Sequence, residues 1–426
     1  MRVLRRLRAT LAELDTIELL FYLVVALFFV GKAYKPAVVL LDIIFLVRLA
    51  KDPSIRQRLL RYRSFVTSLL LFGLYVAIQP LFIDYSLIIA PNSAEEIAHM
   101  VMLLAAIVTF DNITRLRRLI VVAWVAVGVV LLDSIYQYFV GHDIFGVPTV
   151  FSHRLTAWRE GKSLVGPMLG MFAGLFLVAP FIFERRWLKA VAVAMALATF
   201  GVMVLAGNRA PLLAMVSAVL FLALISRFRK QIVAVGLLFG MLFGAVMVAN
   251  PELASQYKAL LNPTTNTATS GRYHLFLVGW EMIKDNPVIG IGPEGYRYHF
   301  KTYNERVDWE RFERYKMELY YTYHEIPHHV HSVAIDMVLA YGVVGFLLLL
   351  WMLWNFFRTF VLRSEYAKLA ALGFFYCISP LAFSKAFTSD TWQFMTYLSM
   401  VFVVAVAQAF MDETAKSLGN RRDRRR

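Results

Sequence analysis

The chain has 426 residues, of which 59% are hydrophobic and only 17% are charged, and its formal net charge is +15. A soluble protein of this size could not bury so much apolar side chain, so the composition excludes a soluble globular protein and predicts that a lipid bilayer surrounds most of the chain. The single cysteine excludes an intrachain disulfide and a cluster of thiolate metal ligands.

Apolar runs close to the length needed to cross a bilayer recur along the whole chain. The basic N-terminus is followed by an apolar run without a small-residue cleavage site, so we predict a retained first helix rather than a removed signal peptide. We expect an all-α integral membrane protein with about twelve transmembrane helices. The predicted spans cover residues 17–31, 36–50, 64–83, 97–110, 119–140, 164–183, 187–206, 210–226, 231–249, 330–357, 366–386 and 391–411.

These spans divide the chain into four parts: residues 1–249 with spans one to nine, a large loop at 250–329, residues 330–411 with spans ten to twelve, and a basic tail at 412–426. Most Lys and Arg residues fall in segments on one side of this arrangement, which predicts cytoplasmic termini and a large loop on the outer face. The positive charge is explained by this bias and by attraction to anionic lipids, so it gives no reason to expect nucleic-acid binding.

The large loop is polar and too long to be a simple connector, and loops of this length are usually functional. We expect an amphipathic helix from Tyr273 to Ile283, ended by Asp285-Asn286-Pro287. The alternating charges of residues 305–314 predict a second, surface helix.

Three arginines near the outer face are candidates for binding an anion. Arg209 follows Gly207-Asn208 in a short outer turn, although an arginine there can also simply reach the lipid headgroups. Arg272 lies where Ser270 could cap the helix of the large loop, and Arg154 lies among other cations in the loop at 141–163. The alternatives for these two are a solvated surface arginine and an ordinary loop charge.

Histidines are concentrated at the start of the tenth span, in His328-His329-Val330-His331-Ser332. A neutral imidazole titrates near neutral pH and can act as a general base. Metal binding by His328, His329 and His331 is an alternative, although a third strong ligand is missing from the pattern. Asp336 and Lys385, charged residues within or near spans, are secondary candidates.

Several of these segments together resemble the O-antigen ligase and polymerase superfamily of bacterial envelopes. The segments are Gly207-Asn208-Arg209, Ser270-Gly271-Arg272, Trp280, Asn286-Pro287, Gly290-Ile291-Gly292-Pro293, His331-Ser332 and Gly342-Val343-Val344-Gly345. Nine residues separate His331-Ser332 from the Gly-x-x-Gly motif, a spacing that resembles the ligase branch in particular.

The resemblance implies a glycosyltransferase of the bacterial inner membrane whose active site faces the periplasm. It would transfer O-antigen polysaccharide from undecaprenyl diphosphate to lipid A–core, with inversion and without a metal ion or other cofactor. Arg209 and Arg272 would bind the diphosphate. His331 would be the base that activates the acceptor hydroxyl, supported by Arg154, His329, Ser332 and Gly342.

Three alternatives stay open. An O-antigen polymerase would use the same carrier to extend a glycan, and an O-linked protein oligosaccharyltransferase would use a protein hydroxyl as the acceptor. Proteins of the second kind often carry an extra C-terminal soluble domain, whereas this chain has about 15 residues after its last predicted span. A transporter of lipid-linked sugar typically has paired repeats and charges in mid-membrane, which this pattern lacks.

Overall fold

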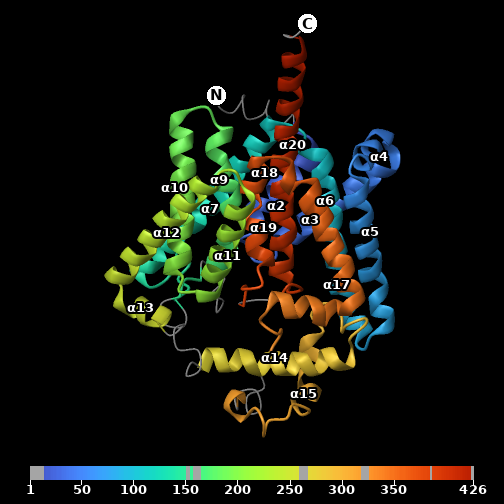
Figure 1. Cartoon of the computed structure of the whole chain (residues 1–426), viewed down its shortest axis with the longest axis vertical. Helices are drawn as coiled ribbons and strands as arrows, with labels where there is room; N and C mark the ends of the chain where they lie inside the picture. Colours follow the sequence, from blue (N-terminus) through green and yellow to red (C-terminus); the bar gives the residue numbers. More distant parts are fainter. Residues whose placement is uncertain are drawn as a thin grey trace.

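The computed structural model describes residues 14–149, 154–156, 165–258, 267–317, 326–383 and 386–423. These residues form a bundle of helices, and the described part of the chain contains no strand apart from one isolated bridge between His142 and Pro148. Figure 1 shows α14 and α15 lying beneath one end of the bundle, while the C-terminal part of α20 extends from the other end. The helix satisfies every backbone N–H and C=O within one segment, which apolar surroundings require. The all-α prediction is therefore confirmed.

In chain order the α-helices are α2 (Thr16–Leu27), α3 (Tyr34–Lys51), α4 (Pro53–Leu60), α5 (Arg63–Ile78), α6 (Ser86–Thr109), α7 (Ile113–Val140), α8 (Val165–Gly170), α9 (Ala173–Ile182), α10 (Arg186–Leu205), α11 (Arg209–Ile225), α12 (Arg229–Ala249), α13 (Pro251–Lys258), α14 (Thr267–Asp285), α15 (Tyr296–Asn304), α17 (Val333–Thr359), α18 (Glu365–Ala370), α19 (Leu372–Ile378) and α20 (Asp390–Asp423). The short 3-10 helices are η1 (Gln79–Phe82), η2 (Glu313–Tyr315) and η3 (Val361–Arg363).

Among the described residues, 8 helices are long and apolar enough to cross a membrane, and α2 and α11 are shorter apolar helices. The chain is thus a multi-pass membrane protein, while the number of twelve spans stays a prediction. Two predicted spans are broken, one into α8 and α9 and the other into α18 and α19. The helix at the predicted span 97–110 is longer than expected, because α6 begins at Ser86. Glu96 lies buried within it and accepts a hydrogen bond from the Tyr341 hydroxyl at 2.8 Å.

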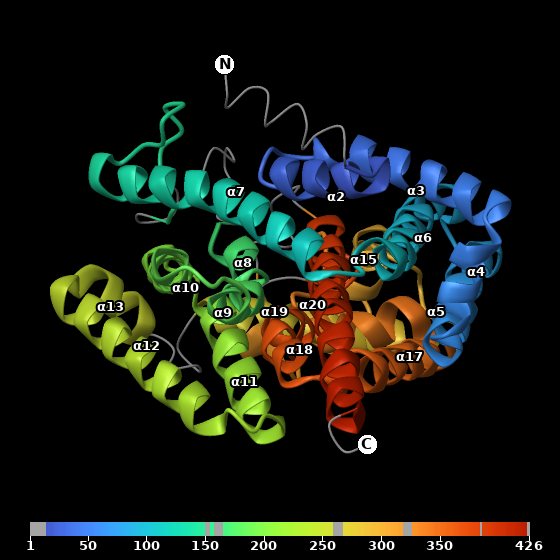
Figure 2. The same cartoon turned by 90° about the horizontal axis from the view of Figure 1, so that it is seen from above.

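The helices differ in how far the protein covers them. The membrane-crossing part of α20 is wholly buried, so this helix forms the centre of the bundle. Only 6% of the corresponding part of α12 is buried, and Figure 2 shows α12 and α13 at the edge of the molecule, on the side away from α5. The bundle therefore has a buried centre and, at its edge, one helix that is mostly exposed.

The large loop has an apolar core of its own. Its buried members include Leu275, Val278, Met282, Ile291, Tyr296 and Phe300. The predicted helix at 273–283 is confirmed within α14, whereas the predicted helix at 305–314 is wrong, because turns and η2 occupy this region. Trp309 folds the chain back there: its indole N–H donates to the Asn304 carbonyl at 2.8 Å and its ring stacks on His274 at 4.2 Å.

A backbone break in α17 joins this loop to the bundle. Gly342 has φ 59° and ψ −172°, so the helix is interrupted and neighbouring backbone groups lose their helical partners. The segment after α14 supplies replacements: the hydrogen bonds run from Ile291 N to Leu339 O (3.0 Å), Gly292 N to Ala340 O (2.9 Å), Val343 N to Pro287 O (2.8 Å) and Val344 N to Val288 O (3.2 Å). We call residues 287–292 the docking segment.

Substituting Gly342 with alanine should weaken this junction. A Cβ at Gly342 would lie 2.4 Å from the Val288 carbonyl oxygen, and the positive φ disfavours any side chain. We expect Gly342→Ala to cost about 2 kcal/mol or more and to lower the thermal unfolding midpoint of the detergent-solubilised protein by several degrees.

The matched control is Gly244→Ala, because a Cβ at Gly244 has no atom within 4 Å and alanine favours a helix interior. An unchanged midpoint in Gly342→Ala would show that the docking segment does not depend on the break.

Candidate functional site

Three arginines from separate parts of the chain meet at the end of the bundle next to α14. Arg209 is the first residue of α11, Arg272 lies in the second turn of α14, and Arg154 belongs to the loop after α7. Burial and the nearby positive charge of Arg209 lower the pKa values of both Arg154 and Arg272 below the usual arginine range. Clustered guanidinium groups repel one another unless an anion lies between them, so this arrangement favours a multiply charged anion.

Local sequence explains how Arg209 reaches this place. The turn between α10 and α11 is short, and Gly207 adopts a φ of +68° that lets the chain reverse tightly. Pro211 then lies in the first turn of α11, where its missing N–H costs nothing. The start of a helix carries the positive end of the helix dipole, which adds positive potential beside the arginine.

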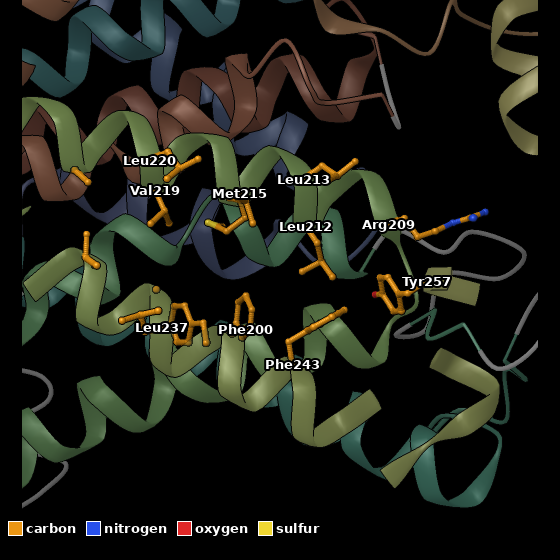
Figure 3. A pocket seen from close by; sticks show the side chains of 16 residues that line it. Phe200, Arg209, Leu212, Leu213, Met215, Val219, Leu220, Leu237, Phe243 and Tyr257 are labelled. Carbon is orange, nitrogen blue, oxygen red and sulfur yellow. The ribbon is translucent and has the colours of Figure 1, made fainter. Parts of the chain in front are cut away.

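An apolar groove of about 430 Å³ extends from Arg209 between α10, α11 and α12. Its walls are formed mainly by Leu, Val, Met, Phe and Gly residues, and Figure 3 shows Arg209 and Tyr257 at one end with the guanidinium pointing away from the apolar side chains. The hydroxyl of Tyr257 donates to the Val204 carbonyl at 3.0 Å, which fixes its ring at the groove's mouth. We call this cavity the lipid-facing groove.

No sequence pattern singles out Tyr257. It is one tyrosine among 20, in a stretch without a motif, and its importance arises from a contact with a residue 53 positions earlier in the chain. Burial raises its pKa, while the charges of Arg154 and Arg209 lower it, so this phenol lies within the field of the arginine cluster.

His331 immediately precedes α17. Its φ of +55° places a non-glycine residue in the left-handed region, a strained conformation that is concentrated at functional sites. The next residue, Ser332, caps α17 by accepting a hydrogen bond from Ile335 N at 3.3 Å. The His329 ring lies 4.3 Å from that of His331, centroid to centroid.

Packing places His331 near the middle of α14. The preceding residue, Val330, is completely buried, and a Cβ on Gly279 of α14 would lie only 3.1 Å from its side chain. Arg272 is seven residues before Gly279 on the same helix, which corresponds to about 10 Å of helix length. Val330 therefore meets α14 about two turns along the helix from Arg272.

The remaining candidates lie in structural positions. Gly342 holds the docking segment, as described above. The buried carboxylate of Asp336 accepts two hydrogen bonds from Thr388, both at 2.8 Å, and so ties the first turn of α17 to the start of α20. Ser270 lies inside α14 instead of capping it, because the helix begins at Thr267. Lys385 lies outside the described residues.

In the part of the chain that the structure describes, no three His, Cys, Asp or Glu side chains lie close enough together to hold a metal ion. His328, His329 and His331 belong to this described part of the chain.

Residues 194–350, a little over a third of the chain, match the family model described as O-antigen ligase. The matched region contains Arg209, Arg272, His331 and Gly342, whereas Arg154 lies outside it. None of the curated proteins compared matches the chain. The chain is therefore a multi-pass membrane protein with a region similar to the O-antigen ligase family.

The clustered charges generate a prediction about stability. Removing one of several repelling cations should not destabilise the fold, so Arg272→Gln should leave the thermal unfolding midpoint unchanged or raise it by a degree or two. Thermal unfolding of the two purified proteins, in the same detergent at low salt, checks this. A clear decrease in the midpoint would mean that Arg272 serves the fold rather than a ligand.

Proposed function

We propose that this protein is an O-antigen ligase, which transfers polysaccharide from undecaprenyl diphosphate to lipid A–core. The observation that carries the proposal is the meeting of three arginines at the mouth of an apolar groove. A polyprenyl diphosphate has the matching chemistry, because its long apolar chain ends in a strongly anionic group. Arg209 and Arg272 would bind the diphosphate through paired N–H donors, with Arg154 in support.

We also propose that the end of the bundle carrying α14 faces the periplasm of a bacterial inner membrane. The Lys and Arg residues of the sequence favour the opposite, cytoplasmic side for both termini. Twelve passes follow if α3 and the broken pair α18–α19 also cross, in addition to α2, α11 and the eight long spans, one of which is the broken pair α8–α9. The donor then lies in the membrane with its diphosphate at the periplasmic boundary.

In the proposed reaction, His331 takes the proton of an acceptor sugar hydroxyl as this oxygen attacks the anomeric carbon of the donor. The bond from that carbon to the diphosphate breaks, and the new glycosidic bond forms with inversion. The leaving diphosphate has low basicity and is stabilised by the arginines, so the step needs no metal ion. Full activity in excess chelator would support this last point, and activity restored by a divalent cation would refute it.

The function is tested by deleting the gene in its own host and returning wild-type or variant alleles. We expect the deletion to lose all polymer-capped lipopolysaccharide and to accumulate polymer on the undecaprenyl carrier. Three variants should each restore less than about one hundredth of the wild-type capping: His331→Ala, Arg209→Ala and Arg272→Ala. Each removes a group that acts in the transition state.

Lipopolysaccharide gels, together with immunoblots of the membrane fraction, provide the measurement and the expression control. Core that still carries one repeat unit, with only the long polymer missing, would identify a polymerase instead. Full capping by a stably expressed His331→Ala would remove this residue as the base.

A second prediction concerns the lipid-facing groove. Gly240 of α12 lines it, and a Cβ at Gly240 meets no atom within 4 Å. Gly240→Leu should therefore fill the groove without disturbing the helix and raise the donor KM by about tenfold.

Gly244 on the same helix is equally open but is not among the groove residues, so Gly244→Leu is the matched control. Steady-state assays with purified donor measure both variants. Equal donor KM values for the two would contradict the assignment of the groove.

A further inference from the structure

We propose that the acceptor glycolipid binds on the opposite flank from the donor, with its sugar head on a cluster formed by Tyr85, Arg297, Tyr298 and His299. This inference rests on the proposed function. It assigns the second substrate to a surface that the arginine cluster and the groove do not involve. We call these four residues the aromatic cluster.

The direction of the reaction sets where the acceptor must lie. In a displacement with inversion, the attacking oxygen approaches the anomeric carbon from the side opposite the leaving diphosphate. The diphosphate ligand Arg272 lies in the second turn of α14, and Val330 meets this helix two turns later, at Gly279. The acceptor sugar is therefore expected beyond His331, toward the C-terminal end of α14.

That end of α14 leads directly to another part of the membrane boundary. The docking segment follows α14, and a Cβ on Gly292 would lie 2.5 Å from Ile83, in the turn between α5 and α6, and 2.7 Å from Ile89, in the first turn of α6. Figure 1 shows α14 running beneath the bundle toward α5 and α17, and Figure 2 shows α12 and α13 on the far side from α5. The donor groove and the α5–α6 turn thus lie on opposite flanks.

The aromatic cluster is built where this turn meets α15. The ring of Tyr85 stacks on that of Tyr298 with centroids 5.7 Å apart and planes at 30°, and it meets the edge of His299 at 5.1 Å. The Arg297 guanidinium carbon lies 5.2 Å from the centre of the Tyr298 ring. Aromatic rings bind the apolar faces of sugars, and an adjacent guanidinium binds acidic substituents.

The backbone and the surroundings favour a ligand that belongs partly to the bilayer. Tyr85 has a φ of +58°, a strained conformation for tyrosine that nevertheless presents its half-exposed ring at the surface. Beside it, Leu81 is 78% exposed and Leu87 is 90% exposed. An acylated sugar can place its chains against these apolar residues and its head against the rings above them.

A plain alternative is that these residues only anchor the protein at the membrane interface, as tyrosines commonly do. Anchoring predicts no preference for one substrate, whereas an acceptor site predicts a selective effect on the acceptor. The two therefore differ in a measurable way.

The experiment uses the purified full-length enzyme in lipid nanodiscs, with the undecaprenyl-linked polymer as donor and polymer-free lipopolysaccharide from the deletion host as acceptor. KM is measured for each substrate while the other is saturating. We expect Tyr298→Ala, Tyr85→Gly and Arg297→Gln each to raise the acceptor KM about fivefold or more. The donor KM should stay within twofold of the wild-type value.

Two design choices guard against loss of structure. Glycine adopts the positive φ at position 85 without strain, so Tyr85→Gly removes the ring without straining the backbone. The control Arg311→Gln removes a guanidinium that lies 5.2 Å from the ring centre of its neighbour Phe312, the same distance as in the Arg297–Tyr298 pair. Arg311→Gln should leave both KM values unchanged.

Parallel increases in the donor and acceptor KM, or an equal effect of Arg311→Gln, would overturn the acceptor assignment while leaving ligase activity intact. If wild-type enzyme transfers nothing to this acceptor but extends the donor glycan, the proposed function fails, and the acceptor site fails with it. The wild-type result therefore separates the two failures.

Discussion

The backbone pairing between the break in α17 and the docking segment is the constraint on which the rest of the site depends. A helix interrupted in apolar surroundings leaves N–H and C=O groups without helical partners, and no water is present there to hydrogen-bond them. Their partners must therefore come from elsewhere in the chain. Gly342 and Gly290 allow two backbones to approach that closely, because a Cβ on Gly290 would lie 2.4 Å from Gly342 N. Gln79 reinforces the junction by donating to the carbonyls of Ile289 and Ala340 at 2.6 and 2.7 Å.

Because that pairing fixes the C-terminal end of α14, it also fixes what the rest of this helix carries. Its middle packs on Val330, next to His331, and its second turn brings Arg272 to Arg209 and Arg154. These cations would separate if they were free to move, so the scaffold holds them together against their mutual repulsion. Under the proposed function, the scaffold gives up some stability there and in return has the diphosphate site arranged before the substrate binds.

Sequence patterns predicted the helical class, α14 and the three arginines, because those features depend on local composition, on Pro and Gly positions and on a known motif spacing. They did not predict the breaks in the spans at α8–α9 and α18–α19. Apolar composition is continuous there, and the breaks accompany a close crossing, in which a Cβ on Gly373 would lie 2.0 Å from the Met171 carbonyl oxygen. Tyr257 and Thr388 were missed for a similar reason, since each matters only through a contact with a distant segment. The start of α6 was misjudged because Glu96 looks like a loop residue until its partner Tyr341 is known.

The exposure of α12 gives the lipid-facing groove an unusual wall. One side of this cavity is a helix of which only 6% of the membrane-crossing part is buried, so the lateral pressure and thickness of the surrounding bilayer act directly on the width of the opening. Under the proposed function, a carrier exchanges there without any rearrangement of the buried centre around α20. Membrane fluidity, and with it growth temperature and acyl-chain composition, then sets how fast the groove fills and empties.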